Sequence, residues 1–125
     1  MKDGKYVIQY VEDDEDFRDS MRTVLEANEY HVIDAASGEE GLRQFKAEQP
    51  DLIIVDLMME EVDTGTAMVR DLKMAGCTAP IIVTSSAGDA LHMTTNYAEL
   101  GLAGVLQKPV DSDRLLALIR SKLQQ

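Results

Sequence analysis

The sequence predicts a doubly wound α/β fold, in which helices cover both faces of a parallel sheet, and two observations support this prediction. Short apolar runs alternate with amphipathic segments along the chain, a pattern that is typical of parallel strands joined by crossover helices. The clearest run, residues 52–55, is unbroken and lies between Pro50-Asp51 and Asp56, which indicates a strand buried on both faces. Five strand and helix pairs with right-handed crossovers predict a (βα)5 three-layer sandwich, and the strand order 2-1-3-4-5 suits it best.

In the first half of the chain we predict three strands and two helices. The strands are expected at residues 6–11, 30–35 and 52–55. A helix over 14–28 carries one apolar stripe, made by Phe17, Met21, Val24 and Leu25. A second helix begins after Ser37, which is a favourable N-cap residue, and ends before Pro50.

The second half continues the alternation with strands at residues 81–84 and 103–106. A helix over about 64–75 precedes them and should end at Gly76, because glycine accepts the left-handed backbone that follows many helices. A more polar helix is expected over 89–100. The last helix begins at a cap among residues 111–113, and its apolar face is formed by Leu115, Leu116, Ile119 and Leu123.

Composition describes an acidic globular protein. The 125 residues fit a single domain over 1–125, with 45% apolar and 28% charged residues. A formal net charge of −11 argues against direct binding to nucleic acid or to an anionic membrane, and favours cations and basic protein surfaces. No membrane-length apolar run or signal peptide is visible, and Cys77 is the only cysteine. We therefore expect a cytoplasmic protein without an internal disulfide.

Acidic side chains follow the first and third predicted strands. Glu12 and Asp13 come after the first strand, and Asp56 ends the third. Because these strands are neighbours in the predicted order, about 4.8 Å apart, the acids can reach one ion, and oxygen ligands suit Mg²⁺. The acids at 14–16 have a simpler role at the start of a helix. Arg18 and Arg22 are expected on the surface.

Two further polar residues fall at the same edge of the predicted sheet. Ser85 follows the fourth strand and Lys108 follows the fifth. A hydroxyl and an ammonium group there could each bind a phosphoryl oxygen. Taken singly, a loop serine is usually a turn residue and a loop lysine is usually solvated. Their common position with the acids favours a shared site.

Over nearly its full length the chain resembles the receiver domain of two-component response regulators, which has a flavodoxin-like fold. Each motif that carries the resemblance is short, but five occur in order at the expected spacings. They are residues 11–14 (VEDD), 50–59 (PDLIIVDLMM), 62–63 (VD), 80–85 (PIIVTS) and 108–109 (KP).

The resemblance implies a Mg²⁺-dependent transfer of a phosphoryl group to Asp56 from a sensor histidine kinase or a histidine phosphotransfer protein. Asp13 would bind the metal directly and Glu12 through water. Met58 would offer the metal its backbone carbonyl.

The resemblance also implies a conformational switch. Ser85 would bind the phosphoryl group and carry the switch, and Lys108 would pair with Asp56 or its phosphate. A downstream protein would then bind differently to the surface of the fourth helix, fifth strand and fifth helix. Because the chain stops at Gln125, we expect a stand-alone receiver of the chemotaxis type, which is a phosphoacceptor with slow self-dephosphorylation and not an enzyme.

Three positions depart from the family pattern. Val105 stands where an aromatic residue usually lies, three residues before the lysine. Glu60 replaces a common proline, and Thr64-Gly65 follows Asp63 where a glycine is common. The aromatic readout of the switch is therefore in question.

Two other functions remain as alternatives. The first is a protein-interaction module that keeps the fold and signals without phosphorylation. The second is a small Mg²⁺-dependent phosphohydrolase, which ranks lower because such enzymes typically need a second acid at the position occupied by Met58.

Overall fold

The structure is a computed structural model that describes residues 2–56, 64–85, 102–107 and 110–123. For residues 64–67 and for Ser85 the description covers the backbone. The predicted helix over 89–100 lies outside the described residues.

Five parallel strands form one sheet, whose order is β2-β1-β3-β4-β5 as predicted. The bounds of the strands agree with the predicted ranges to within one residue. The strands are β1 (Val7–Val11), β2 (His31–Ala35), β3 (Leu52–Asp56), β4 (Ile81–Ser85) and β5 (Gly104–Gln107). β3 extends to Asp56 because this residue still pairs in register with Thr84 of β4. The acid is therefore part of the sheet itself.

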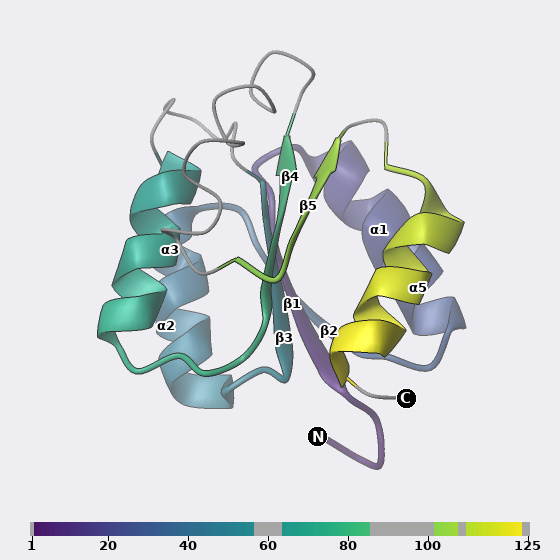
Figure 1. Ribbon diagram of the computed structural model, residues 1–125, viewed down its shortest axis with the longest axis horizontal. Coiled ribbons are helices and arrows are strands. Elements are labelled where there is room, and N and C mark those ends of the chain that lie inside the picture. The colour runs from purple at the N-terminus through teal and green to yellow at the C-terminus, as the bar shows by residue number, and fades with distance from the viewer. Residues whose placement is uncertain (1, 57–63, 86–101, 108–109, 124–125) are drawn as a thin grey trace.

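Helices cover both faces of the sheet, which gives the predicted three layers (Figure 1). One face is covered by α1 (Glu15–Ala27) and α5 (Ser112–Leu123), and the other by α2 (Gly38–Glu48) and α3 (Thr64–Met74). Asp14 and Ser37 accept hydrogen bonds from the first turns of α1 and α2, as N-caps do. Gly76, with φ of +89°, follows the end of α3.

An apolar core lies on each side of the sheet, because alternate residues of a strand face opposite sides. Ile8, Tyr10 and Ile54 pack on the α1–α5 side. Val11 and Val55 pack on the other side, together with Met68, Val69 and Leu72 of α3. The same alternation continues to Glu12 and Asp56, which therefore belong to the α1–α5 side of the sheet.

The apolar stripe of α1 is shorter than predicted. Leu25 is buried, and Met21 and Val24 pack partly against the core, but the side chain of Phe17 is 48% exposed. Phe17 lies in the first turn of the helix and lines the end of a groove between α1 and α5. Met21, Val24 and Leu115 line the same groove.

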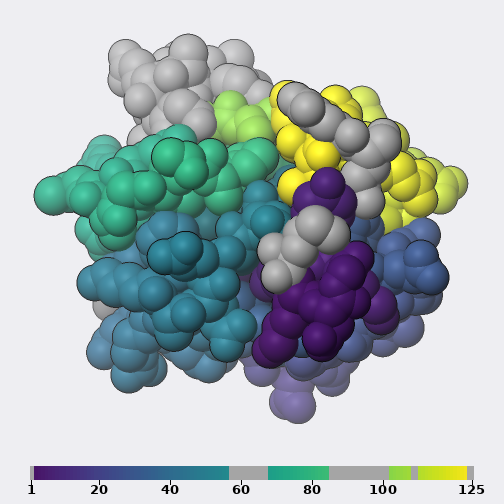
Figure 2. Space-filling model, turned by 90° about the horizontal axis from the view of Figure 1, so that it is seen from below, coloured from purple at the N-terminus to yellow at the C-terminus, as the bar shows by residue number. Residues whose placement is uncertain are grey.

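At the amino-terminal ends of the strands, the backbone N–H of Val7 donates to the carboxylate of Asp51 over 2.8 Å. This bond holds the start of β1 to the residue that precedes β3. Figure 2 shows the molecule from this end, with the first residues of the chain beside the end of α5. The side chains discussed below lie at the opposite edge of the sheet.

Candidate functional site

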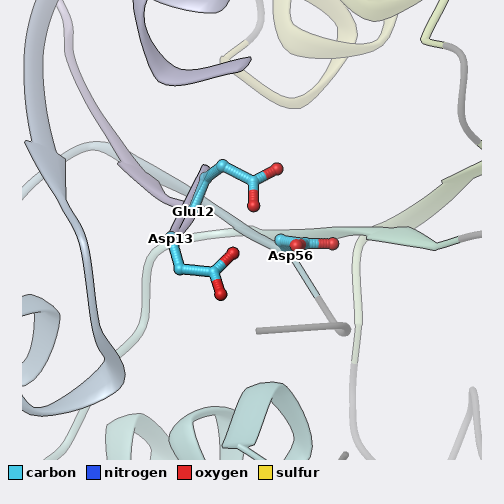
Figure 3. Close-up of side chains that lie close together, drawn as sticks. All are labelled: Glu12, Asp13 and Asp56. Atoms are coloured by element: carbon cyan, nitrogen blue, oxygen red, sulfur yellow. The ribbon is translucent and has the colours of Figure 1, made fainter. Parts of the chain in front are cut away.

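Three acids meet at the carboxyl edge of the sheet. Glu12 and Asp13 follow β1, and Asp56 is the last residue of β3. One carboxylate oxygen from each lies within 4.8 Å of the other two (Figure 3). The register explains this proximity, because Val11 pairs with Val55 and the next residue on each strand is an acid. The structure thus brings together the three acids that the sequence placed at this edge.

The three carboxylates differ in exposure. Glu12 and Asp56 are each 1% exposed, whereas Asp13 is exposed to solvent. Burying a carboxylate costs several kcal/mol unless it is hydrogen-bonded or bound to a cation. The cluster therefore has a buried side that needs protein partners and an open side that water or a ligand can reach.

Hydrogen bonds satisfy the buried side of Glu12. The hydroxyl of Tyr10 donates to Oε1 over 3.3 Å, and the backbone N–H of Asp14 donates to Oε2 over 3.4 Å. Burial, together with the nearby charges of Glu12 and Asp56, raises the pKa of Tyr10 well above its usual range. Its hydroxyl therefore keeps its proton at neutral pH and remains a donor.

A second buried hydroxyl contacts Asp56. Thr84 of β4 is fully buried, and its Oγ1 donates to Oδ1 of Asp56 over 3.5 Å. Neither Tyr10 nor Thr84 was predicted from the sequence as a residue of the site. Their positions carried a signal, since Tyr10 lies two residues before Glu12 and Thr84 comes one residue before the end of the neighbouring strand.

The loop that carries Glu12 and Asp13 is held by α1. One guanidinium nitrogen of Arg18 donates to the carbonyl oxygen of Glu12 over 2.9 Å and to that of Asp13 over 3.1 Å. Arg18 also forms an ion pair with Asp34 over 3.7 Å. The expected surface position of Arg18 was therefore wrong, because the side chain is partly buried across this loop.

The remaining predicted site residues are described less fully. Ser85 ends β4 in register with Gln107, which puts its backbone at the edge where the acids meet. Met58 and Lys108 lie outside the described residues, as do Glu60 and Asp63.

Val105, the position of the expected aromatic residue, lies in β5. Its side chain is partly buried and packs against the core on the α2–α3 side.

The family described as "Response regulator receiver domain" matches residues 8–120 of this chain. The chain belongs to the response regulator receiver domain family. Receiver domains of two-component systems bind Mg²⁺ at an acidic pocket, and the cluster of Glu12, Asp13 and Asp56 corresponds to such a pocket. They also interact with kinases and with downstream targets.

Relatives of this receiver domain include proteins named as transcriptional regulators and response regulators. It is 36% identical to "Probable transcriptional regulator ycf27" of Porphyridium aerugineum, over 97% of this chain and 49% of that protein. It is 33% identical to "Response regulator MprA" of Mycolicibacterium vanbaalenii, over 94% of this chain and 50% of that protein. The chain therefore spans about half the length of the curated relatives that it matches.

Solved structures with the same fold include a receiver domain and a domain from another bacterial protein. A response regulator receiver domain protein from Clostridium thermocellum superposes with a TM-score of 0.87 at 25% identity, covering 95% of this chain and 94% of that one. The N-terminal domain of a protein from Wolinella succinogenes gives a TM-score of 0.85 at 32% identity, covering 95% of this chain and 94% of that one. Among the helices within the described residues, none is both long enough and apolar enough to cross a bilayer.

Proposed function

We propose that this receiver domain accepts a phosphoryl group on Asp56 from a phosphohistidine of a sensor kinase or of a histidine phosphotransfer protein. The observation that carries the proposal is the meeting of three carboxylates, two of them buried, at the edge of the sheet. Three like charges within 4.8 Å repel one another, so the arrangement is best explained by a cation that they bind. Membership of the receiver family supports the same function.

The donor set fits Mg²⁺. Carboxylate oxygens are the ligands that this hard cation prefers, and the exposed side at Asp13 leaves room for the waters that it retains. Asp13 and Asp56 would bind the metal directly, Glu12 would bind through water, and Met58 would contribute its backbone carbonyl. When bound, Mg²⁺ would neutralise charge on the oxygens of the transferred phosphoryl group.

In the transfer, a carboxylate oxygen of Asp56 attacks the phosphorus atom in line with the bond to the donor histidine. The new O–P bond forms as the P–N bond breaks, and the imidazole nitrogen keeps the electron pair of that bond. Lys108 would stabilise the charge on the phosphoryl oxygens. Water later cleaves the O–P bond, which releases phosphate and restores Asp56, so the domain acts as a timed switch and not as an enzyme with its own substrate.

The phosphorylated state would alter the region around the ends of β4 and β5. Ser85 would bind a phosphoryl oxygen and draw its loop inward. The readout would then reach a protein partner through β5, α5 and the predicted helix over 89–100. Because Val105 has no ring to reorient, the movement of the loop itself would carry the signal.

The partner should be a protein. The net charge of −11 favours a basic protein surface over nucleic acid or an anionic membrane. The free thiol of Cys77 suits a reducing compartment such as the cytoplasm. A single domain over 1–125 that acts alone stays a prediction. The curated relatives that this chain matches are about twice as long as the part that it covers. A phosphorylation-independent module is not favoured, because the acids at the edge are all present.

Intact-mass spectrometry tests the acceptor chemistry. The protein is incubated with Mg²⁺ and acetyl phosphate beside two variants, Asp56→Asn and Asp71→Asn, the second of which changes an exposed acid on α3. We expect one added phosphoryl group in the wild type and in Asp71→Asn, and none in Asp56→Asn. The added mass should disappear on standing, and chelation of Mg²⁺ beforehand should prevent it. An unlabelled wild type beside a labelled control receiver, or a labelled Asp56→Asn, would overturn the proposal.

A further inference from the structure

Thr84 places a buried hydroxyl in β4 directly after three apolar residues, Ile81, Ile82 and Val83. The residue is 0% exposed and lies directly beside Asp56 in the register of β3 and β4. Below it on the same side of the sheet, Ile82 and Ile54 pack in the core with α5. Valine has nearly the same shape and suits a buried strand equally well, whereas an unpaired buried hydroxyl is costly. The hydrogen bond to Asp56 therefore accounts for a hydroxyl at this position, which packing alone does not.

The geometry indicates what this contact does to the carboxylate. Oγ1 of Thr84 donates to Oδ1 of Asp56, and a donor fixed on the neighbouring strand restrains rotation of the carboxylate about its Cβ–Cγ bond. Hydrogen bonds to a charged acceptor are stronger than those between neutral groups. One of the two carboxylate oxygens is thus distinguished from the other before any phosphodonor arrives.

The same hydrogen bond suits the product of the transfer. In an acyl phosphate of Asp56, one carboxyl oxygen carries the phosphoryl group and the other becomes a carbonyl oxygen. A carbonyl oxygen still accepts a hydrogen bond. If Oδ1 is the oxygen that becomes the carbonyl, Thr84 bonds to it before and after the transfer, and no donor must reorganise during the reaction.

We propose that Thr84 is a positioning residue for phosphoryl transfer, which holds Oδ1 of Asp56 so that the other carboxylate oxygen is the one that attacks phosphorus. This inference rests on the proposed function of Asp56 as phosphoacceptor. The task of Thr84 differs from that proposed for Ser85, because Thr84 acts on the carboxylate and Ser85 would act on the transferred group.

Two variants separate the hydroxyl from the shape of the side chain. Thr84→Val keeps the shape and removes the hydroxyl, whereas Thr84→Ser keeps the hydroxyl and removes the methyl group. The first readout is the carbon-13 resonance of the Asp56 carboxyl group at constant pH without Mg²⁺, assigned by its absence in Asp56→Asn. The second is the rate constant of phosphorylation at saturating Mg²⁺ and acetyl phosphate, together with the Mg²⁺ concentration that gives half of that rate.

For Thr84→Val we expect a displaced carboxyl resonance and a maximal rate constant lowered by about 3- to 10-fold, which is the effect of one hydrogen bond. The half-saturating Mg²⁺ concentration should change less than the rate. For Thr84→Ser we expect a resonance and a rate close to those of the wild type.

A Thr84→Val variant with the wild-type resonance and rate would overturn the inference while leaving the proposed function of Asp56 in place. A Thr84→Ser variant as slow as Thr84→Val would also overturn it, because the loss would then come from the missing methyl group or from altered packing. A wild type that takes up no phosphoryl group would overturn both proposals. The carboxyl resonance distinguishes that case, since it reports the hydrogen bond without any reaction.

Discussion

Replacing Asp56 by asparagine should stabilise the fold when no divalent cation is present. The wild-type carboxylate lies within 4.8 Å of the carboxylates of Glu12 and Asp13. At a separation of 4.8 Å, with an effective dielectric constant of about 20, the repulsion of one pair of full charges is about 3.5 kcal/mol. Asparagine removes the charge but keeps an oxygen that can accept the hydrogen bond from Thr84.

The expected gain is smaller than the sum of two such repulsions. Asp13 is exposed, so water screens its charge, and the guanidinium group of Arg18 lies against the same loop. We therefore expect the free energy of unfolding to rise by about 1 to 3 kcal/mol. For a chain of 125 residues, 1 kcal/mol corresponds to a change of about 4 °C in Tm, so the variant should melt about 4 to 12 °C higher.

Thermal unfolding followed by circular dichroism, with EDTA and then with Mg²⁺, measures this effect. Asp71→Asn is the matched control, because it removes one negative charge from an exposed position on α3. Its Tm should stay within about 2 °C of the wild type. Mg²⁺ should raise the Tm of the wild type and of the control, and should raise that of Asp56→Asn much less.

Two results would refute this reasoning. If Asp56→Asn melts below the wild type in EDTA, the carboxylate contributes more through its hydrogen bonds than it costs through repulsion. If Mg²⁺ raises the Tm of all three proteins equally, the cation does not bind at the cluster.

Other predictions follow from single contacts. Arg18→Ala should weaken Mg²⁺ binding several-fold in a calorimetric titration, because Arg18 holds the loop of Glu12 and Asp13. Arg22→Ala removes contacts to Asp34 and Glu26 but none to this loop, and should not weaken Mg²⁺ binding. Equal losses of Mg²⁺ affinity in the two variants would contradict the role of Arg18 in holding the loop. In urea titrations, Leu72→Ala should lower the free energy of unfolding by about 2 to 5 kcal/mol, because the side chain of Leu72 is fully buried. Met74 on the same helix is 87% exposed, and Met74→Ala should change the free energy of unfolding by less than about 0.5 kcal/mol. Cys77 should react slowly with iodoacetamide in the native protein and rapidly in urea, because it is 7% exposed and burial raises the pKa of its thiol; rapid native labelling, seen by mass spectrometry, would show that the thiol is accessible.

The sheet and its acidic edge were predictable from the sequence because they depend on local patterns. An unbroken run such as residues 52–55, bounded by Pro50-Asp51 and Asp56, is typical of a strand covered on both faces, and the strand order then places Glu12 beside Asp56. These inferences needed only the period of the apolar residues and the positions at which the runs stop.

The supports of the site were less predictable because they depend on tertiary geometry. The side chain of Arg18 reaches two carbonyl groups of the loop that precedes α1. This contact depends on the direction in which α1 leaves the loop, and no local sequence pattern specifies that direction. Phe17 fits the apolar period of α1 and is nevertheless half exposed, since the period defines a face of the helix but not how far along it the neighbouring core extends. Thr84 could have been found, because alternation along β4 places it on the same side of the sheet as Asp56.

The origin of the site in two separate strands also bears on how the chain folds. Asp56 follows Asp13 by 43 residues, and the segment between them contains α1, β2 and α2. No local fragment can therefore assemble the acid cluster, which forms only when β1 pairs with β3 and loop closure over that distance has been achieved. Charge repulsion then opposes the pairing at its carboxyl end, while the hydrogen bond from Val7 to Asp51 favours it at the other end. A cation that binds only after the strands have paired would slow unfolding more than it would accelerate folding.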